Sequence, residues 1–249
     1  MRWLPIWRRN FMVWRRLMHE SIVGNVAEPI ITLLAFGYGF GSLLPPIEGV
    51  QYIAFLASGA ICMNTFNAAT FESLYSAFTR MHVQRSWEAM LNAPLSLDDV
   101  VLAEMLWAAT KSVFTGVAVL AVIFALGISR EPGMLLALPM LLVIGMAASS
   151  LALVVNALAR GYDFFTYYFT LVVTPMWFLS GVFFPIAQMP IWLESLSRLL
   201  PLTAAVNLVR PLILGRVPAH PLRDLAVLIV YTIAGFYLAM ILTRRRLLK

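Results

Sequence analysis

The chain has 249 residues, of which 61% are hydrophobic and 12% are charged, and its formal net charge is +6. Because a soluble domain carries roughly 45–50% apolar and about 25% charged residues, this composition excludes an ordinary soluble protein and predicts an all-α polytopic membrane protein. The single cysteine, Cys62, gives no basis for a disulfide or a thiolate metal site.

The first 27 residues predict an amphipathic helix, from about Pro5 to Ile22, that lies in the membrane interface. At about 100° per residue, an apolar face adjoins a basic one. The apolar face holds Trp7, Phe11, Trp14, Met18 and Ile22, and the basic face holds Arg8, Arg9, Arg15, Arg16 and His19. This helix is either a topology-setting anchor or a moving part that links cytoplasmic events to the first span.

Six charge-free windows of 18 or more residues follow along the chain. They are residues 29–47, 49–71, 112–129, 132–159, 164–193 and 225–243. A bilayer core about 30 Å thick needs roughly 20 apolar residues per helix, so each window predicts one membrane span. The fifth window is too long for one span, and its second half contains Pro185 and Pro190, so it predicts a span followed by a different element.

Basic residues are distributed unequally between the two sides that six spans create. Twelve lie on the side of the termini and five on the other side, while Lys111 falls inside the third span. The positive-inside rule therefore predicts that both termini are cytoplasmic. Topology and anionic membrane lipids account for the net charge, so no nucleic acid partner is needed to explain it.

The loop between the second and third spans, residues 79–98, predicts a short cytoplasmic helix that stops at Pro94. Its apolar face and flanking charges are Arg85, Trp87, Glu88, Met90 and Leu91. A cytoplasmic partner could bind an exposed aromatic residue on such a helix. The alternative is that this segment is a turn packed on lipid headgroups. Ser96 and Asp99 then have the spacing of a capping box at the start of the third span.

Polar side chains within the spans need partners. They include Asn67, Glu72, Glu104 and Lys111. Because a charge at the bilayer centre costs roughly 2.5–3.5 kcal/mol, we expect Lys111 to form an ion pair with Glu72 or Glu104, or else to line a polar path. Tyr167 and Tyr168 in the fifth window could stack on sugar, or could face lipid at the interface.

A proline-rich tract runs from Thr174 to Gly215. Its prolines are Pro175, Pro185, Pro190, Pro201 and Pro211. Each ring removes a hydrogen-bond donor and clashes with the preceding turn, so the tract is predicted to break into short helices at the membrane surface. Irregular backbone at this depth needs cover from protein or a wet cavity, which suggests part of a transport path.

The sequence contains no HExxH motif, no metal-spaced cluster and no phosphate-binding loop around Lys111. Energy for uphill movement would therefore come from another chain. A membrane enzyme acting on lipid or glycan, a non-transporting assembly factor and a permease of a binding-protein-dependent importer are the alternatives to an exporter.

Two blocks of the sequence resemble the permease subunits of ABC type-2 exporters. They are Phe66–Ser112, with the run RMHVQRSWEAMLNAPLSLDD, and Tyr162–Pro190, with the run TPMWFLSGVFFP. The likeness is closest to nodulation-factor (lipo-chitooligosaccharide) exporter permeases of the NodJ type. It covers nearly the whole chain as one transmembrane domain, residues 1–249.

The resemblance implies a homodimer of six-span permeases with two copies of a separate ABC ATPase, which binds the ATP and magnesium. This chain would then be no enzyme and would hold no cofactor. Residues 85–91 would form the ATPase-coupling helix, and residues 184–221 would form extracytoplasmic re-entrant helices between spans five and six. The outer cap of the pathway would include Phe184, Pro185, Pro190 and Trp192.

The implied location is the bacterial inner membrane. The implied cargo is an amphipathic molecule such as a lipid-linked or acylated oligosaccharide, and efflux of drugs or other amphiphiles is the alternative.

Overall fold

The computed structural model describes residues 2–16, 18, 27, 29–41, 43–47 and 49–247. Within these ranges the chain is helical, apart from turns and one isolated bridge between Ile47 and Val50, which confirms the predicted all-α class. The N-terminal half comprises α1 (Leu4–Arg16), η1 (Leu33–Tyr38), α3 (Tyr52–Phe71), η2 (Glu72–Ser76), η3 (Thr79–Val83), α4 (Ser86–Leu91) and α5 (Leu97–Ala125). The C-terminal half comprises α6 (Gly133–Leu158), α7 (Asp163–Tyr168), η4 (Phe169–Val173), α8 (Thr174–Leu179), η5 (Ile186–Gln188), α9 (Ile191–Ser197), α10 (Pro201–Ile213) and α11 (Pro221–Leu247).

Four helices are long and apolar enough to cross a membrane: Tyr52–Val83, Leu97–Ala125, Gly133–Leu158 and Pro221–Leu247. The bent pair formed by α9 and α10 raises the number of candidates to five if it counts as one span, with an angle of 83° between the two helices. The predicted first and fifth spans correspond to shorter helices, Pro29–Tyr38 and residues 163–179. The second of these ends where Gly181 adopts a positive φ of 75°, which a helix cannot continue through. Six spans therefore remain a prediction.

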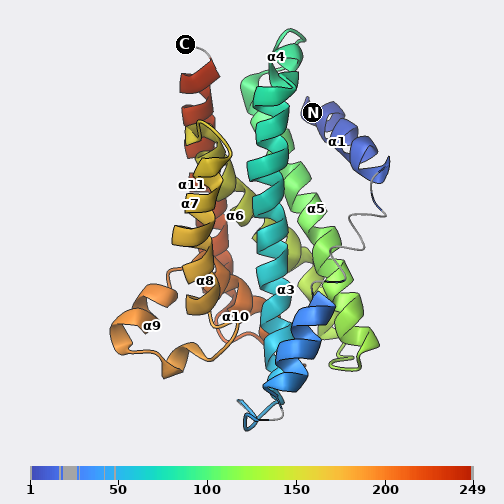
Figure 1. Ribbon diagram of the computed structural model, residues 1–249, viewed down its shortest axis with the longest axis vertical. Helices are drawn as coiled ribbons and strands as arrows, with labels where there is room; N and C mark the ends of the chain where they lie inside the picture. Colours follow the sequence, from blue (N-terminus) through green and yellow to red (C-terminus); the bar gives the residue numbers. More distant parts are fainter. Residues whose placement is uncertain are drawn as a thin grey trace.

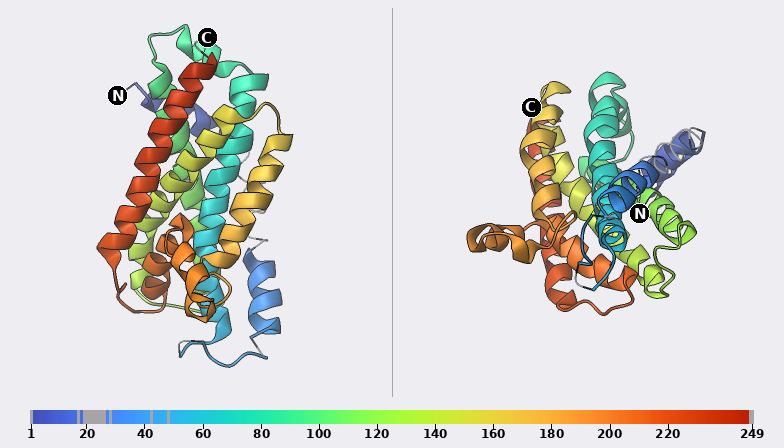
Figure 2. Two further views of the ribbon diagram at one scale, coloured as in Figure 1. Left: turned by 90° about the vertical axis from the view of Figure 1, so that its left-hand side faces the viewer. Right: turned by 60° about the horizontal axis from the view of Figure 1, so that its bottom comes forward.

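The helix Tyr52–Val83 is the centre of the bundle, because 78% of its most apolar window is buried, against 17% for α11 at the periphery. α5 and α6 pack against it, and α11 packs along α6 (Figures 1 and 2). Leu56, Phe66 and Ile144 are fully buried in the core between these helices. Apolar packing of this kind holds transmembrane helices together through close contact and not through expulsion of water.

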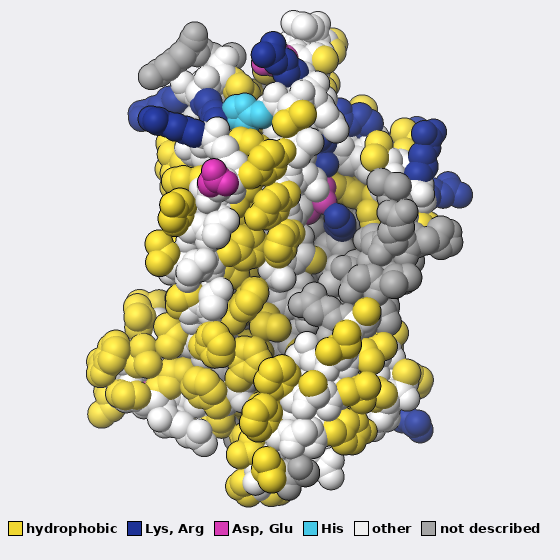
Figure 3. Space-filling view, in the orientation of Figure 1, with side chains coloured by type: hydrophobic (Ala, Val, Ile, Leu, Met, Phe, Trp, Pro, Cys, Tyr) yellow, Lys and Arg dark blue, Asp and Glu magenta, His cyan; other side chains and the backbone are white. Residues whose placement is uncertain are grey.

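The two ends of the bundle differ. The N-terminal helix α1, the short helix α4 and the C-terminus lie at one end, which we call the terminal end (Figure 1). The elements α9 and α10 lie at the opposite end, which we call the distal end. On the face shown in Figure 3, most Arg and Lys side chains gather at the terminal end, above a largely apolar surface. This placement of both termini agrees with an even number of crossings.

Several predicted boundaries are corrected. α4 begins at Ser86 and not at Arg85, because Arg85 adopts the left-handed conformation with φ of 49°. The capping box is present: Ser96 Oγ accepts from the Asp99 N–H at 3.2 Å, and Asp99 Oδ2 accepts from the Ser96 N–H at 3.1 Å. α1 ends at Arg16, and of the predicted remainder up to Ile22, only Met18 is among the described residues.

The prolines of the tract do not all break helices. Pro190 is the N-cap of α9 and Pro201 is the first residue of α10, so both mark helix starts, but Pro175 lies in the first turn of α8 and Pro211 lies inside α10. The prediction was wrong at these two positions. At Pro175 the preceding π-helical turn, η4, already alters the hydrogen-bond ladder, and Pro211 falls in the last turn of its helix.

Close approach of α5 and α6 depends on Gly145, and we expect Gly145→Val to destabilise the bundle. A Cβ atom there would lie 2.2 Å from Ser112 Oγ and 2.9 Å from the Ala109 Cα, so the helices would have to separate. Overpacking of this kind costs about 1–3 kcal/mol. Thermal unfolding of the detergent-purified protein measures it. Gly161→Ala, where nothing lies within 4 Å of the added Cβ, is the control and should unfold like the parent.

A buried charge network beside a polar cavity

Two π-helical turns, η2 and η3, extend the central helix at its terminal end and position its charged residues. Glu72 opens η2 and Arg80 lies in η3. In a straight α-helix a spacing of eight residues rotates the second side chain by about 80° from the first. The wider turn brings them together, so that Arg80 Nη2 donates to Glu72 Oε1 at 3.0 Å. π turns of this kind are frequent at functional sites.

Glu104 of α5 is the centre of this charge network, and it is 1% exposed. Its carboxylate accepts from Arg80 Nε at 3.0 Å and from Arg80 Nη2 at 2.6 Å. It also accepts from Trp87 Nε1 at 3.2 Å and from Asn10 Nδ2 at 3.3 Å. One carboxylate therefore joins α1, η3 and α4 to α5, and each contact is a charge-assisted hydrogen bond.

Glu72 is the second buried carboxylate and is 4% exposed. It accepts from Trp107 Nε1 at 2.8 Å, from Ser76 Oγ at 2.9 Å and from Lys111 Nζ at 2.7 Å. Lys111 thus pairs with Glu72, one of its two predicted partners, while Arg80 bridges both carboxylates. Two cations and two anions balance in this network, which is the condition for charges to persist in an apolar bundle.

Sequence reasoning missed Arg80, because the comparison of basic residues on the two sides of the membrane treats it only as a residue of the loop after the second span. The eight-residue spacing from Glu72 would have suggested a pair only if the π turn had been foreseen, and hydropathy does not report π turns. Asn67, another predicted buried polar residue, lies apart from the network, and its Oδ1 is buried without a hydrogen-bond partner among the described atoms.

The prediction of an exposed aromatic residue on α4 was wrong. Trp87 is 1% exposed, because its indole packs under α4 and donates to Glu104. Met90 and Leu91 are half-buried against the same cluster, whereas Arg85 and Glu88 are exposed. The exposed side of this segment therefore carries charged residues, and the Trp87 indole lies on its buried side.

The aromatic face of α1 contacts α5. Trp7 stacks on Phe11 with ring centroids 5.5 Å apart, and Trp14 stacks on Phe114 at 4.7 Å. Trp107 contacts the rings of Trp7, Phe11 and Trp14 edge-on, with ring centroids 6.3–6.4 Å apart. Arg8 and Arg15 are exposed on the other side of the helix. The predicted apolar face exists, and in this structure it covers the third predicted span.

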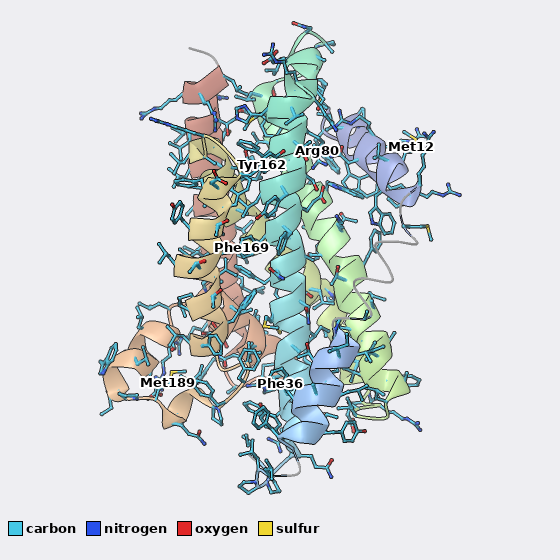
Figure 4. The ribbon with its side chains drawn as sticks, viewed as in Figure 1. Met12, Phe36, Arg80, Tyr162, Phe169 and Met189 are labelled. Atoms are coloured by element: carbon cyan, nitrogen blue, oxygen red, sulfur yellow. The ribbon has the colours of Figure 1, made fainter. Side chains whose placement is uncertain are left out.

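A cavity of about 620 Å³ opens between α1, the π-helical part of the central helix and α5, and we call it the inner cavity. The charged residues on its wall are Arg9, Glu72, Arg80 and Lys111. Figure 4 shows Arg80 where the central helix faces α1 and α5, while Tyr162 and Phe169 lie on the side of α7 and η4.

The predicted pathway tyrosines lie on that other side. Tyr167 is 64% exposed, whereas Tyr168 is half-buried against the cluster that also holds Phe165. Phe169 packs on Phe71 of the central helix at 4.5 Å. An aromatic seam therefore joins the predicted fifth span to the central helix.

At the distal end, Arg210 of α10 is a second residue that sequence reasoning missed. Its guanidinium lies 3.7 Å from the centroid of Phe55 and donates to Ser58 Oγ at 3.1 Å and to the Gly181 carbonyl at 2.7 Å. It ties α10 to α3 and to the turn after α8. Of the predicted outer-cap residues on this tract, Phe184, Pro190 and Trp192 are exposed and Pro185 is buried.

Removing charge from the centre of the network should destabilise the protein strongly, and Glu104→Gln tests it. Arg80 would lose one of its two carboxylate partners, and breaking a buried pair costs about 3–5 kcal/mol. Thermal unfolding in detergent measures the loss. Glu194→Gln removes the exposed pair with Arg198 and is the matched control, with a cost of about 0.5 kcal/mol. Equal stability of the two variants would contradict a structural role for the network.

Known proteins resemble this chain over nearly its whole length. The family described as ABC-2 type transporter matches residues 2–214. Nodulation protein J of Rhizobium leguminosarum bv. trifolii is 44% identical over 247 residues, covering 99% of this chain and 94% of that protein. Nodulation protein J of Bradyrhizobium diazoefficiens is 43% identical with the same coverage.

A more distant relative widens the comparison beyond nodulation proteins. The inner membrane transport permease YadH of Escherichia coli is 26% identical over 235 residues, covering 94% of this chain and 90% of that protein. The family match and these similarities over nearly the whole chain lead to one assignment. The chain belongs to the ABC-2 type transporter family, as a transport permease subunit.

Proposed function

We propose that this permease is the membrane subunit of an ATP-driven exporter in a bacterial inner membrane, with both termini in the cytoplasm. Two six-span protomers associate, and each binds one copy of a separate ABC ATPase that supplies ATP and magnesium chemistry. The cargo is an amphipathic molecule, of the class of lipid-linked or acylated oligosaccharides. The observation that carries the proposal is the similarity to nodulation proteins J across 99% of the chain.

Coupling to the ATPase would run through α4 and the charge network. The ATPase would contact the exposed Arg85 and Glu88, together with the basic face of α1 that holds Arg8 and Arg15. Movement of α4 would then reach Glu104 directly, because the Trp87 indole donates to its carboxylate at 3.2 Å. Since Glu104 also binds groups on α1 and η3, one displacement would shift three elements together.

The cargo would travel between protomers along the side of the bundle that carries residues 163–179. Tyr167 is exposed there, and aromatic rings can stack on sugar or slide past acyl chains. The bent pair α9–α10 would form the re-entrant outer cap, held to the central helix by Arg210.

Co-expression with the ATPase encoded beside this chain tests the proposal most directly. We expect a complex that survives purification in lipid and hydrolyses ATP, with a rate that rises when the cognate amphiphile is added. Lipid extracts fractionated by polarity identify that amphiphile. Absence of any ATPase complex, together with unchanged export in a deletion strain, would refute the proposal.

Trp87→Phe tests the coupling route, because it keeps a buried aromatic ring but removes the indole N–H that binds Glu104, together with part of the indole ring. We expect the ATPase complex to assemble, while cargo-stimulated ATP hydrolysis falls about tenfold, as loss of a hydrogen bond to a charged group predicts. Trp192→Phe at the distal end, where the indole is 71% exposed, is the matched control and should leave stimulation unchanged. Full stimulation in Trp87→Phe would rule out this route.

Tyr167→Ala tests the proposed pathway. The side chain is largely exposed, so the protein should fold normally, while transport of the amphiphile into inverted vesicles should slow by a factor of about five to ten, as loss of one stacking contact predicts. Tyr237→Ala on the peripheral helix α11, where the ring is 55% exposed, removes a comparable aromatic side chain and should not affect transport. Equal transport rates in both variants would exclude Tyr167 from the pathway.

A further inference from the structure

The inner cavity is lined by charged and by apolar side chains. Arg80 and Lys111 lie on its wall with Glu72, and Arg9 lies on the α1 side. Val13, which is 58% exposed, and the half-buried Trp14 also line it from α1. The cavity is therefore amphipathic, because basic groups and apolar groups share its wall.

Arg9 is the cation of this wall that the network does not neutralise. Arg80 and Lys111 each form an ion pair with a carboxylate. The Arg9 guanidinium instead donates to Asn10 Oδ1 at 2.9 and 3.3 Å, and it forms no ion pair within the part of the chain that the structure describes. Partial burial lowers the pKa of this guanidinium, which an anionic ligand would counteract. The described wall therefore carries an excess of positive charge at Arg9.

The volume and location of the cavity suit a lipid head group. About 620 Å³ lies within the range of small-molecule sites, roughly 300–1,000 Å³. α1 is amphipathic and basic, and such helices lie where lipid phosphates are concentrated. A planar guanidinium matches two phosphate oxygens at once, which favours a phosphate over a neutral head group.

We propose that the inner cavity binds the phosphate-bearing head group of an anionic phospholipid through Arg9, with the acyl chains leaving over Val13 into the surrounding leaflet. The bound lipid fastens α1 to the central helix and α5. The site is distinct from the proposed export path, because α7, the helix that contains Tyr167, lies across the central helix from α1 (Figure 1). This proposal uses the proposed orientation, with both termini in the cytoplasm, only to identify the surrounding leaflet as the cytoplasmic one.

Lipid-dependent thermal stability of the full-length chain, purified alone in neutral detergent, tests this site. We expect phosphatidylglycerol in mixed micelles to raise the unfolding midpoint by roughly 5 °C over the same amount of phosphatidylcholine. Arg9→Gln should lose most of this difference. Arg8→Gln, the adjacent exposed arginine outside the cavity wall, makes the same change of charge and should keep it.

Three outcomes would overturn the proposal. Equal effects of the two lipids would exclude an anionic site, and equal losses in Arg8→Gln and Arg9→Gln would indicate diffuse attraction to the basic helix. Equal stabilisation by inorganic phosphate would make the site one for a soluble anion. Native mass spectrometry of the parent protein gives a second measurement that needs no variant, with one retained phosphatidylglycerol per chain expected and none contradicting the site. No ATPase is present, so failure of the export proposal would not alter these results.

Discussion

The ion pair between Arg80 and Glu104 is the constraint on which the terminal end of this molecule depends. The Glu104 side chain is 1% exposed and the Arg80 side chain 14%, and a charge left alone in an apolar bundle is far more costly than an unpaired neutral group. The Glu104 carboxylate has few acceptor positions, and Arg80, Trp87 and Asn10 occupy them. One side chain of α5 therefore binds groups on α1, α4 and the central helix at once.

The distal end is held by a different kind of contact. Arg210 donates to backbone carbonyls and to the Ser58 hydroxyl, and its guanidinium lies over the ring of Phe55. The guanidinium of Arg210 donates to the carbonyl oxygens of Gly181 and Val182 in the turn after α8, so it holds a segment of backbone and not a single side chain. The central helix thus spans two polar junctions with an apolar core between them. A displacement at one junction would reach the other through closely packed side chains.

The sequence predicted the features that arise from local rules. Composition predicted the membrane class, the Ser96–Asp99 spacing predicted the start of α5, and the α1 wheel predicted an aromatic face. It failed where tertiary contacts decide. Trp87 looked exposed because a short charged loop gives no sign of a buried acceptor beneath it. Arg80 looked like a topology signal because its partner lies on a π-helical turn. The number of spans stays a prediction, because residues 163–179 form a helix that ends shortly before Gly181, which adopts a positive φ.

The π turn η2 also constrains how this chain can vary in length. A π turn accommodates one residue more than an α turn. Glu72 and Arg80, which are eight positions apart, therefore lie on one face of the helix, as residues seven positions apart do on a regular α-helix. Deleting one residue inside η2 would turn it into a regular α-helical turn and leave the Glu72 and Arg80 side chains on the same face of the helix. The same deletion in α5 between Glu104 and Lys111 would rotate one residue away from the other by about 100° and break the network. Length variation is therefore tolerable in the central helix at a place where the neighbouring helix permits none.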